Sequence, residues 1–149
     1  MKLIASFLLL LLMLGCKGPK AHHDSSDSKT EMQEITCIKQ IIKEDSILGS
    51  IRNQSSEMIS LSETISNYTN DLKALNFTQC PEKFKLAFDK HIEAWLAIQV
   101  ITNKYPSTRG ELHEIFADLE KSEDSTEFKS VVKQIWDTWN VVEKSAKLN

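Results

Sequence analysis

The sequence predicts an all-α protein, an antiparallel four-helix bundle with a short extra connecting helix. Apolar residues recur at three- and four-residue spacing through most of the chain, which is the periodicity of a helix face. No stretch alternates with a period of two over the length of a strand. Glycine and proline are scarce, at 4 and 3 residues, so the chain has few of the turns that a many-stranded sheet needs.

The first segment, residues 1–15, is predicted to be an export signal. Its apolar run from Leu3 to Leu14 is well short of the about 20 residues that a membrane-spanning helix requires. The run follows Lys2 and ends in Met13-Leu14-Gly15-Cys16, which resembles the bacterial lipobox. That resemblance implies cleavage before Cys16, diacylation of its thiol by chains such as palmitate, and acylation of the new amino terminus. Two or more acyl chains anchor a protein stably. An ordinary signal peptide with an incidental cysteine is the alternative.

The predicted location is the bacterial cell envelope, with the membrane contacted through the N-terminal lipid. Lys17 stands where an Asp retains enterobacterial lipoproteins at the inner membrane, so the resemblance favours the outer membrane. The net charge of −3, without a basic stripe, argues against nucleic acid as a partner. We expect a monomer that meets an unidentified protein partner.

Residues 16–30 are predicted to be the lipidated Cys16 and a flexible tether, which leads to a helical-bundle domain at 31–149. The stretch KGPKAHHDSSDSKT contains almost no large apolar group, so it cannot bury enough surface to offset the entropy of ordering. His22 and His23 offer metal-binding side chains, but a solvated linker is the simpler interpretation.

The first two helices of the domain are predicted on either side of a polar turn. Met32 to Ile42 place apolar groups on one helix face, and Asn53 to Ser56 are suited to a turn and an N-cap. The next face steps by three and four residues through Met58, Leu61, Ile65, Tyr68, Leu72 and Leu75.

Three further helices are expected after Cys80. Pro81 is tolerated at a first helical position, and the helix it opens is closed by Pro106. Its predicted apolar face is Phe84, Phe88, His91, Trp95, Ile98, Thr102 and Tyr105. A short helix covers ELHEIFADLE, and a last helix starts at Ser125 or Thr126. The last helix is expected to bury Phe128, Val132, Ile135, Trp139, Val142 and Ala146.

A continuous helix over 31–75, paired with another chain as a coiled coil, is the competing layout. Cys37 and Cys80 distinguish the two, because an exported chain meets oxidising conditions in which an even pair of thiols usually bridges. Only a hairpin near Asn53 brings both cysteines to one end of the bundle. We therefore predict a Cys37–Cys80 disulfide, with two free buried thiols as the alternative.

His91 is the candidate ligand contact, together with Tyr68 and Trp95. It lies on an apolar face, where desolvation lowers a histidine pKa. The hairpin layout puts Tyr68 within one turn, so a Tyr68–His91 hydrogen bond is expected. The stretch FKLAFDKHIEAW, with Phe88, His91, Ala94 and Trp95, resembles F-x-x-H-x-x-A-W segments of uncharacterised secreted bacterial helical bundles. That resemblance implies a bundle fold and no particular activity.

The predicted function is a non-enzymatic binding or structural module, anchored by lipid. The alternative is a bundle that binds a small ligand or metal through His91. Motifs for haem attachment, di-iron carboxylates, zinc proteases, serine hydrolases, phosphate loops and calcium loops are all absent from the sequence. We therefore predict no catalytic residues, no metal ligands and no cofactor. A filled interior around His91 would favour the first function. An open pocket with a Tyr or carboxylate would favour the second, or a third alternative, an enzyme of a type that no motif reveals.

We expect Cys16→Ser to abolish acylation and to leave the protein unprocessed or unanchored, because the thiol is the acceptor for the diacyl group. Metabolic labelling with a fatty acid, followed by isolation of the protein, measures this. Label that persists on the variant would rule out the lipoprotein interpretation.

Overall fold

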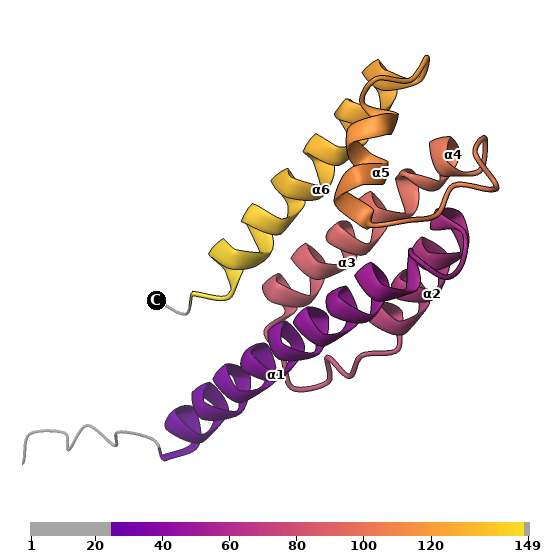
Figure 1. Ribbon diagram of the computed structural model, residues 1–149. Helices are drawn as coiled ribbons and strands as arrows, with labels where there is room; N and C mark the ends of the chain where they lie inside the picture. The colour runs from indigo at the N-terminus through magenta and orange to yellow at the C-terminus, as the bar shows by residue number, and fades with distance from the viewer. Residues whose placement is uncertain (1–24, 148–149) are drawn as a thin grey trace, which may run out of the picture.

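The computed structural model describes residues 25–147, and in this part of the chain every regular element is a helix. The helices are α1 (Ser25–Ser55), α2 (Leu61–Lys73), α3 (Glu82–Ala97), α4 (Gln99–Thr102), α5 (Leu112–Leu119) and α6 (Ser125–Ser145) (Figure 1). The all-α prediction is confirmed. The predicted signal peptide and Cys16 lie outside the described residues. None of the helices in 25–147 is both long and apolar enough to cross a membrane.

Contacts at the two ends of the bundle fix the directions of the long helices. Cys37, in the first half of α1, lies beside Cys80, just before α3. At the opposite end, the amide of Gly110 donates to the carbonyl of Ser56 over 2.7 Å. The start of α6 is at this second end too, where Asp124 pairs with Lys104 at 2.6 Å. α1 and α3 therefore run one way, and α2 and α6 run back (Figure 1).

The long helices pack in the order α1, α2, α3, α6. α1 packs mainly on α2, α2 also on α3, and α3 packs most extensively on α6. α1 and α6 make little direct contact with each other, although they are the first and last members of the series. α5 lies between α6 and the C-terminal part of α1 (Figure 1). The bundle is thus left open along the side between α1 and α6.

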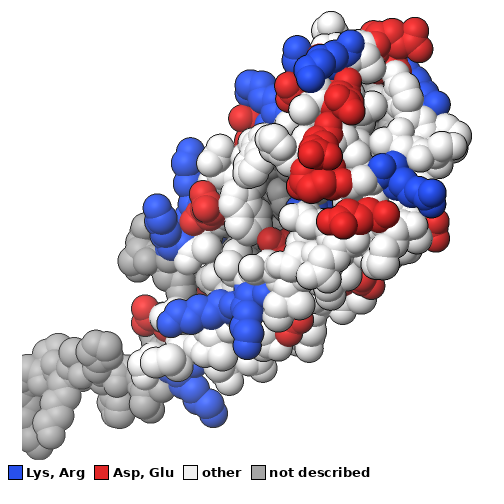
Figure 2. Space-filling view, viewed as in Figure 1, with Lys and Arg blue, Asp and Glu red and all other residues white. Residues whose placement is uncertain are grey.

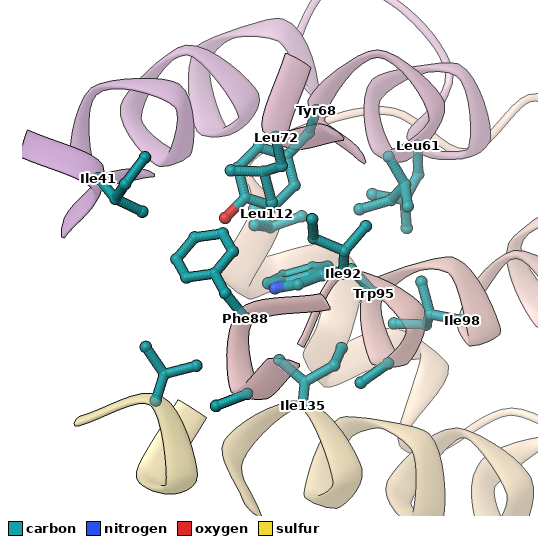
Figure 3. Close-up of a cluster of buried hydrophobic side chains, with 14 of the residues drawn as sticks. Ile41, Leu61, Tyr68, Leu72, Phe88, Ile92, Trp95, Ile98, Leu112 and Ile135 are labelled. Atoms are coloured by element: carbon teal, nitrogen blue, oxygen red, sulfur yellow. The ribbon is translucent and has the colours of Figure 1, made fainter. Parts of the chain in front are cut away.

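Buried side chains of α2, α3 and α6 form most of the core, which also includes Ile38 and Ile41 of α1 and Leu112, Ile115 and Leu119 of α5. Figure 3 shows Phe88 and Trp95 of α3 between Tyr68 of α2 and Ile135 of α6. The predicted faces of α2 and α3 are confirmed, since these residues are all buried: Leu61, Ile65, Tyr68, Leu72, Phe84, Phe88, His91, Trp95, Ile98 and Thr102. Leu75 and Tyr105 of these faces are only partly buried. Two predicted positions are exposed: Met58, which lies in the turn before α2, at 68%, and Met32 of the first predicted face, at 64%.

Two predicted boundaries differ in the structure. α1 begins at Ser25, so the predicted flexible tether is helical over its last residues. Residues 28–30 are exposed, and a solvated segment without Pro or Gly can still be helical. The helix expected from Pro81 to Tyr105 ends at Ala97 and continues as the separate turn α4.

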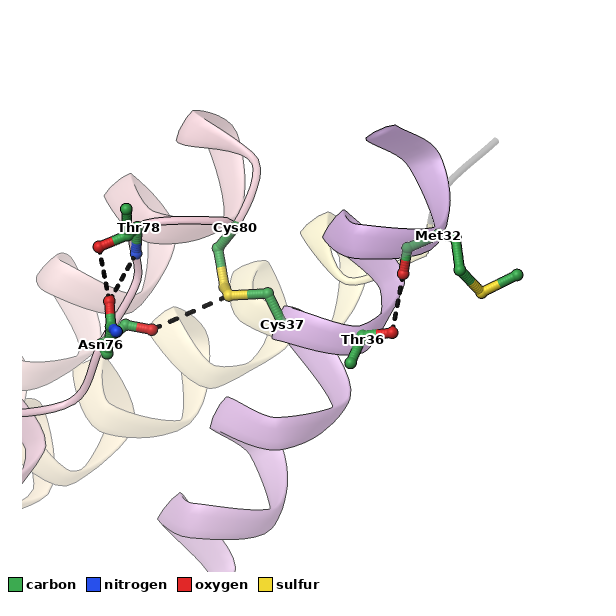
Figure 4. The surroundings of a disulfide bond; sticks show 6 residues. All are labelled: Met32, Thr36, Cys37, Asn76, Thr78 and Cys80. Carbon is green, nitrogen blue, oxygen red and sulfur yellow. Dashed lines mark hydrogen bonds between the residues drawn. A yellow bond between two sulfur atoms is a disulfide. The ribbon is translucent and has the colours of Figure 1, made fainter. Parts of the chain in front are cut away.

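The predicted disulfide is present. The sulfur atoms of Cys37 and Cys80 are 2.03 Å apart and their Cα atoms 5.2 Å apart (Figure 4). The same sulfur of Cys37 lies 3.9 Å from the carbonyl oxygen of Asn76, and this is a packing contact because an oxidised sulfur has no proton to donate. The hairpin after Ser55 and the bond together exclude the continuous helix over 31–75.

We expect reduction of this disulfide to lower the free energy of unfolding by about 4 kcal/mol, because the bond closes a loop with a sequence separation of 43 residues. Denaturant unfolding of the Cys37→Ser/Cys80→Ser double variant, beside the unmodified protein, measures this. Alkylation under denaturing, non-reducing conditions is the control and should modify neither cysteine. Modification of both, with an unchanged unfolding midpoint, would contradict the bridge.

Candidate functional site

The open side of the bundle contains a cavity of about 630 Å³. α1, α5 and α6 form its walls, and Tyr68 of α2 with His91 and Trp95 of α3 form its floor. Figure 2 shows the hollow, with acidic side chains gathered over α5 beside it. All three sequence-predicted ligand contacts therefore line one cavity.

The imidazole of His91 is held at both nitrogens. The indole N–H of Trp95 donates to Nε2 over 3.1 Å, so Nε2 carries no proton. Nδ1 is then the protonated nitrogen, and it donates to the hydroxyl oxygen of Thr138 on α6, also at 3.1 Å. The Thr138 hydroxyl in turn lies 2.9 Å from the backbone carbonyl of Gln134, to which it donates. The chain from Trp95 to α6 is consistent only with a neutral His91.

Burial is the main reason that His91 stays neutral. Only 4% of the residue is exposed, and this desolvation lowers its pKa from 6.5 to about 4. A backbone hydrogen bond with Ile135 raises the pKa in part, and the nearby positive charge of Arg52 lowers it further. Because both nitrogens are already engaged, His91 offers neither a free base nor a metal ligand while these bonds persist.

The predicted Tyr68–His91 hydrogen bond is wrong. The Tyr68 hydroxyl donates instead to Oδ1 of Asp45 on α1, over 2.7 Å. A carboxylate is a stronger acceptor than an imidazole nitrogen, and Trp95, one turn along the same helix, already donates to that nitrogen. Tyr68 does meet the other predicted contact, since its ring packs edge-on against Trp95 with centroids 5.3 Å apart.

Arg52 of α1 reaches over both aromatic rings of the floor. Its Cζ lies 4.3 Å from the centroid of the Trp95 ring and 4.7 Å from that of Tyr68. Asp45 lies two turns earlier on the same helix, where burial raises the pKa of its carboxyl. The sequence interpretation missed both residues. A signal was present, since the apolar positions Ile38 and Ile41 continue at the same spacing through Asp45, Leu48 and Arg52.

All three tryptophans of the chain line the cavity. Trp95 is part of the floor, and Trp139 packs beside the His91 ring at a centroid distance of 5.2 Å. Trp136 is 63% exposed, at the α6 wall. The cavity therefore combines a large aromatic surface with a few charged groups, which is typical of sites that bind small organic molecules.

The described residues contain no group of three or more His, Cys, Asp or Glu side chains placed to hold a metal ion. Comparisons with protein-family models, curated proteins and solved structures find no match to this chain. Inferences about function therefore rest on the sequence and on the geometry of the cavity.

We expect His91 to make the protein less stable in acid. Its pKa is lower in the folded protein, about 4, than the ordinary 6.5, so between these values the unfolded chain binds more protons. The contribution of neutral His91 to the free energy of unfolding is thus fully present above about pH 6.5. It decreases by on the order of 3 kcal/mol as the pH drops to about 4.

Denaturant unfolding across this pH range, for the unmodified protein and His91→Phe, measures how steeply the free energy of unfolding of each changes with pH. Loss of the hydrogen bonds in the variant changes its free energy of unfolding by the same amount at every pH. The pH dependence that other titrating groups contribute stays unchanged. His113→Gln is the control, because the His113 side chain is 90% exposed. An equal slope in His91→Phe and the unmodified protein would contradict a buried, neutral His91.

Proposed function

We propose that this chain is a lipid-anchored, non-enzymatic binding protein of the bacterial cell envelope that holds a small organic ligand in the cavity between α1, α5 and α6. The cavity is the observation that carries this proposal. A structural or scaffold role would be served by a filled interior, whereas here about 630 Å³ adjoins the His91, Tyr68 and Trp95 side chains.

The floor of the cavity supports a binding role because it is organised without a ligand. Hydrogen bonds hold the Trp95 and His91 rings, and Asp45 holds the Tyr68 hydroxyl. A site whose side chains are already ordered loses little entropy when a ligand binds. The non-enzymatic part of the proposal is supported by His91, the buried imidazole, whose two nitrogens both have partners.

The envelope location and the anchor are supported by the sequence of residues 1–17 alone. Cleavage before Cys16 leaves the tether and then α1, so the bundle would stand off a membrane surface, with the outer membrane favoured by Lys17. A lipid anchor keeps a binding protein at the surface where small molecules enter the envelope.

We expect the neutral aromatic compound N-acetylphenylalaninamide to bind in the cavity. ¹⁹F spectra of full-length protein labelled with 5-fluorotryptophan, in detergent solution, measure this, because all three tryptophans line the cavity. Their signals should shift saturably, with a Kd at or below about 1 mM. Ala117→Leu should prevent the shift, because Ala117 lines the cavity and the larger side chain fills it.

The matched control is Glu114→Leu, on the same helix but outside the cavity lining, which should bind as the unmodified protein does. Absence of a saturable shift in the unmodified protein, or equal shifts in Ala117→Leu, would contradict the proposed function.

A further inference from the structure

We propose that the ligand is a zwitterion with an apolar or aromatic body, of the class of an amino acid or a short peptide, with its carboxylate on Arg52 and its ammonium group on Asp45. This assignment rests on the proposed function, because it names the chemistry of the ligand in the same cavity. It is carried by two opposite charges that line the cavity and do not pair with each other.

Arg52 presents unused hydrogen-bond donors to the cavity. Its Nε and Nη2 donate to Oδ1 of its neighbour Asn53, at 3.2 and 3.0 Å. No carboxylate in the described part of the chain lies within the 4.0 Å of an ion pair with it. Within residues 25–147 the remaining N–H groups of the guanidinium have no hydrogen-bond acceptor, and a guanidinium fork matches the geometry of a carboxylate.

The aromatic rings hold this guanidinium in place. Its Cζ lies over both the Trp95 and the Tyr68 rings, and these cation–π contacts favour this position over a turn toward water or a carboxylate. A cation that is oriented by aromatic faces, and not by a carboxylate, keeps its charge available to a ligand.

Asp45 is the complementary charge. It lies seven residues before Arg52 on α1, about 10 Å along the helix axis and on the same face. One carboxylate oxygen accepts the Tyr68 hydroxyl, and the second has no hydrogen-bond partner in the described residues. Tyr68 thus separates the two charges, with Asp45 at its hydroxyl and Arg52 over its ring.

The cavity walls disfavour a simple anion. Glu111 and Glu120, at the two ends of α5, also line the cavity. Backbone N–H groups of His113 and Glu114 lower the pKa of Glu111, so its carboxylate stays charged. An anion bound to Arg52 would be repelled by these negative charges. A simple cation would be repelled by Arg52 itself. A zwitterion compensates both Arg52 and Asp45.

The remaining lining suits an apolar body. Trp136 and Trp139 of α6 and Phe116 of α5 face the same space, and the volume is within the range of pockets for small organic molecules. His91 adds a ring edge and no free nitrogen, because Trp95 and Thr138 engage both. Recognition of the charged ends is therefore left to α1.

Four forms of one compound test the assignment by calorimetry on the full-length protein in detergent. Phenylalanine is the zwitterion, N-acetylphenylalanine the anion, phenylalaninamide the cation, and N-acetylphenylalaninamide the neutral form. We expect phenylalanine to bind about tenfold or more tightly than each of the others, because charge-assisted hydrogen bonds at both ends add to the packing of the ring.

Two variants should change this order in opposite ways. Arg52→Gln should weaken the binding of phenylalanine by about tenfold, and phenylalaninamide should bind as tightly as to the unmodified protein or more tightly. Asp45→Asn, which keeps an acceptor for the Tyr68 hydroxyl, should weaken the binding of phenylalanine to a similar extent. It should leave the affinity for N-acetylphenylalanine unchanged. Arg109→Gln and Asp118→Asn are matched controls outside the cavity lining and should change nothing.

Equal binding of the neutral form and phenylalanine would overturn the zwitterion assignment and leave the proposed function standing. Preferential binding of the anion or the cation would overturn it too. No binding of any form to about 1 mM would contradict both proposals. The series on the unmodified protein decides the question even if a variant fails to fold.

Discussion

Trp95 is the side chain on which the arrangement of the helices depends. Its N–H fixes His91, whose other nitrogen reaches Thr138 on α6. Arg52 of α1 lies over its ring, and the Tyr68 ring of α2 packs against it at an interplanar angle of 84°. One indole thus joins α1, α2, α3 and α6. Truncation of a buried aromatic costs about 3–5 kcal/mol, several times a single hydrogen bond, so packing dominates its contribution to stability and the hydrogen bond decides orientation.

The cavity follows from how α1 and α6 are held. α1 is attached to the rest of the bundle by its packing on α2, by the Cys37–Cys80 bond and by the contact of Ser56 with Gly110. α6 is held by α3. None of these attachments draws α1 onto α6, and α5 occupies only part of the space between them (Figure 1). Two half-buried charges on α1 are retained there without forming an ion pair, although desolvation of unpaired charges is unfavourable. A binding role gives a reason for retaining them.

The parts of the fold with strong apolar periodicity were predictable from the sequence, and so was the disulfide. The faces of α2 and α3 match the predicted residues, because Leu61, Ile65, Phe84 and Phe88 need burial whatever their partner is. Partners across helices were not predictable in the same way. Tyr68 was assigned to His91, but it bonds to Asp45 of α1, whose orientation depends on the whole bundle. The cavity itself has no sequence signature, because it arises where α1 and α6 do not pack against each other. The charged positions Asp45 and Arg52, in register with Ile38 and Ile41, were the available hint.

The floor of the cavity is organised, so the cavity is not a water-filled gap in a loosely packed core. The ¹⁵N spectrum of the His91 ring near pH 7 tests this. We expect a single neutral tautomer, with Nδ1 protonated and Nε2 bare, because Trp95 donates to Nε2 and Nδ1 donates to Thr138. Averaged signals from two exchanging tautomers, or protonation of both nitrogens, would mean that water reaches the ring and would contradict an organised floor.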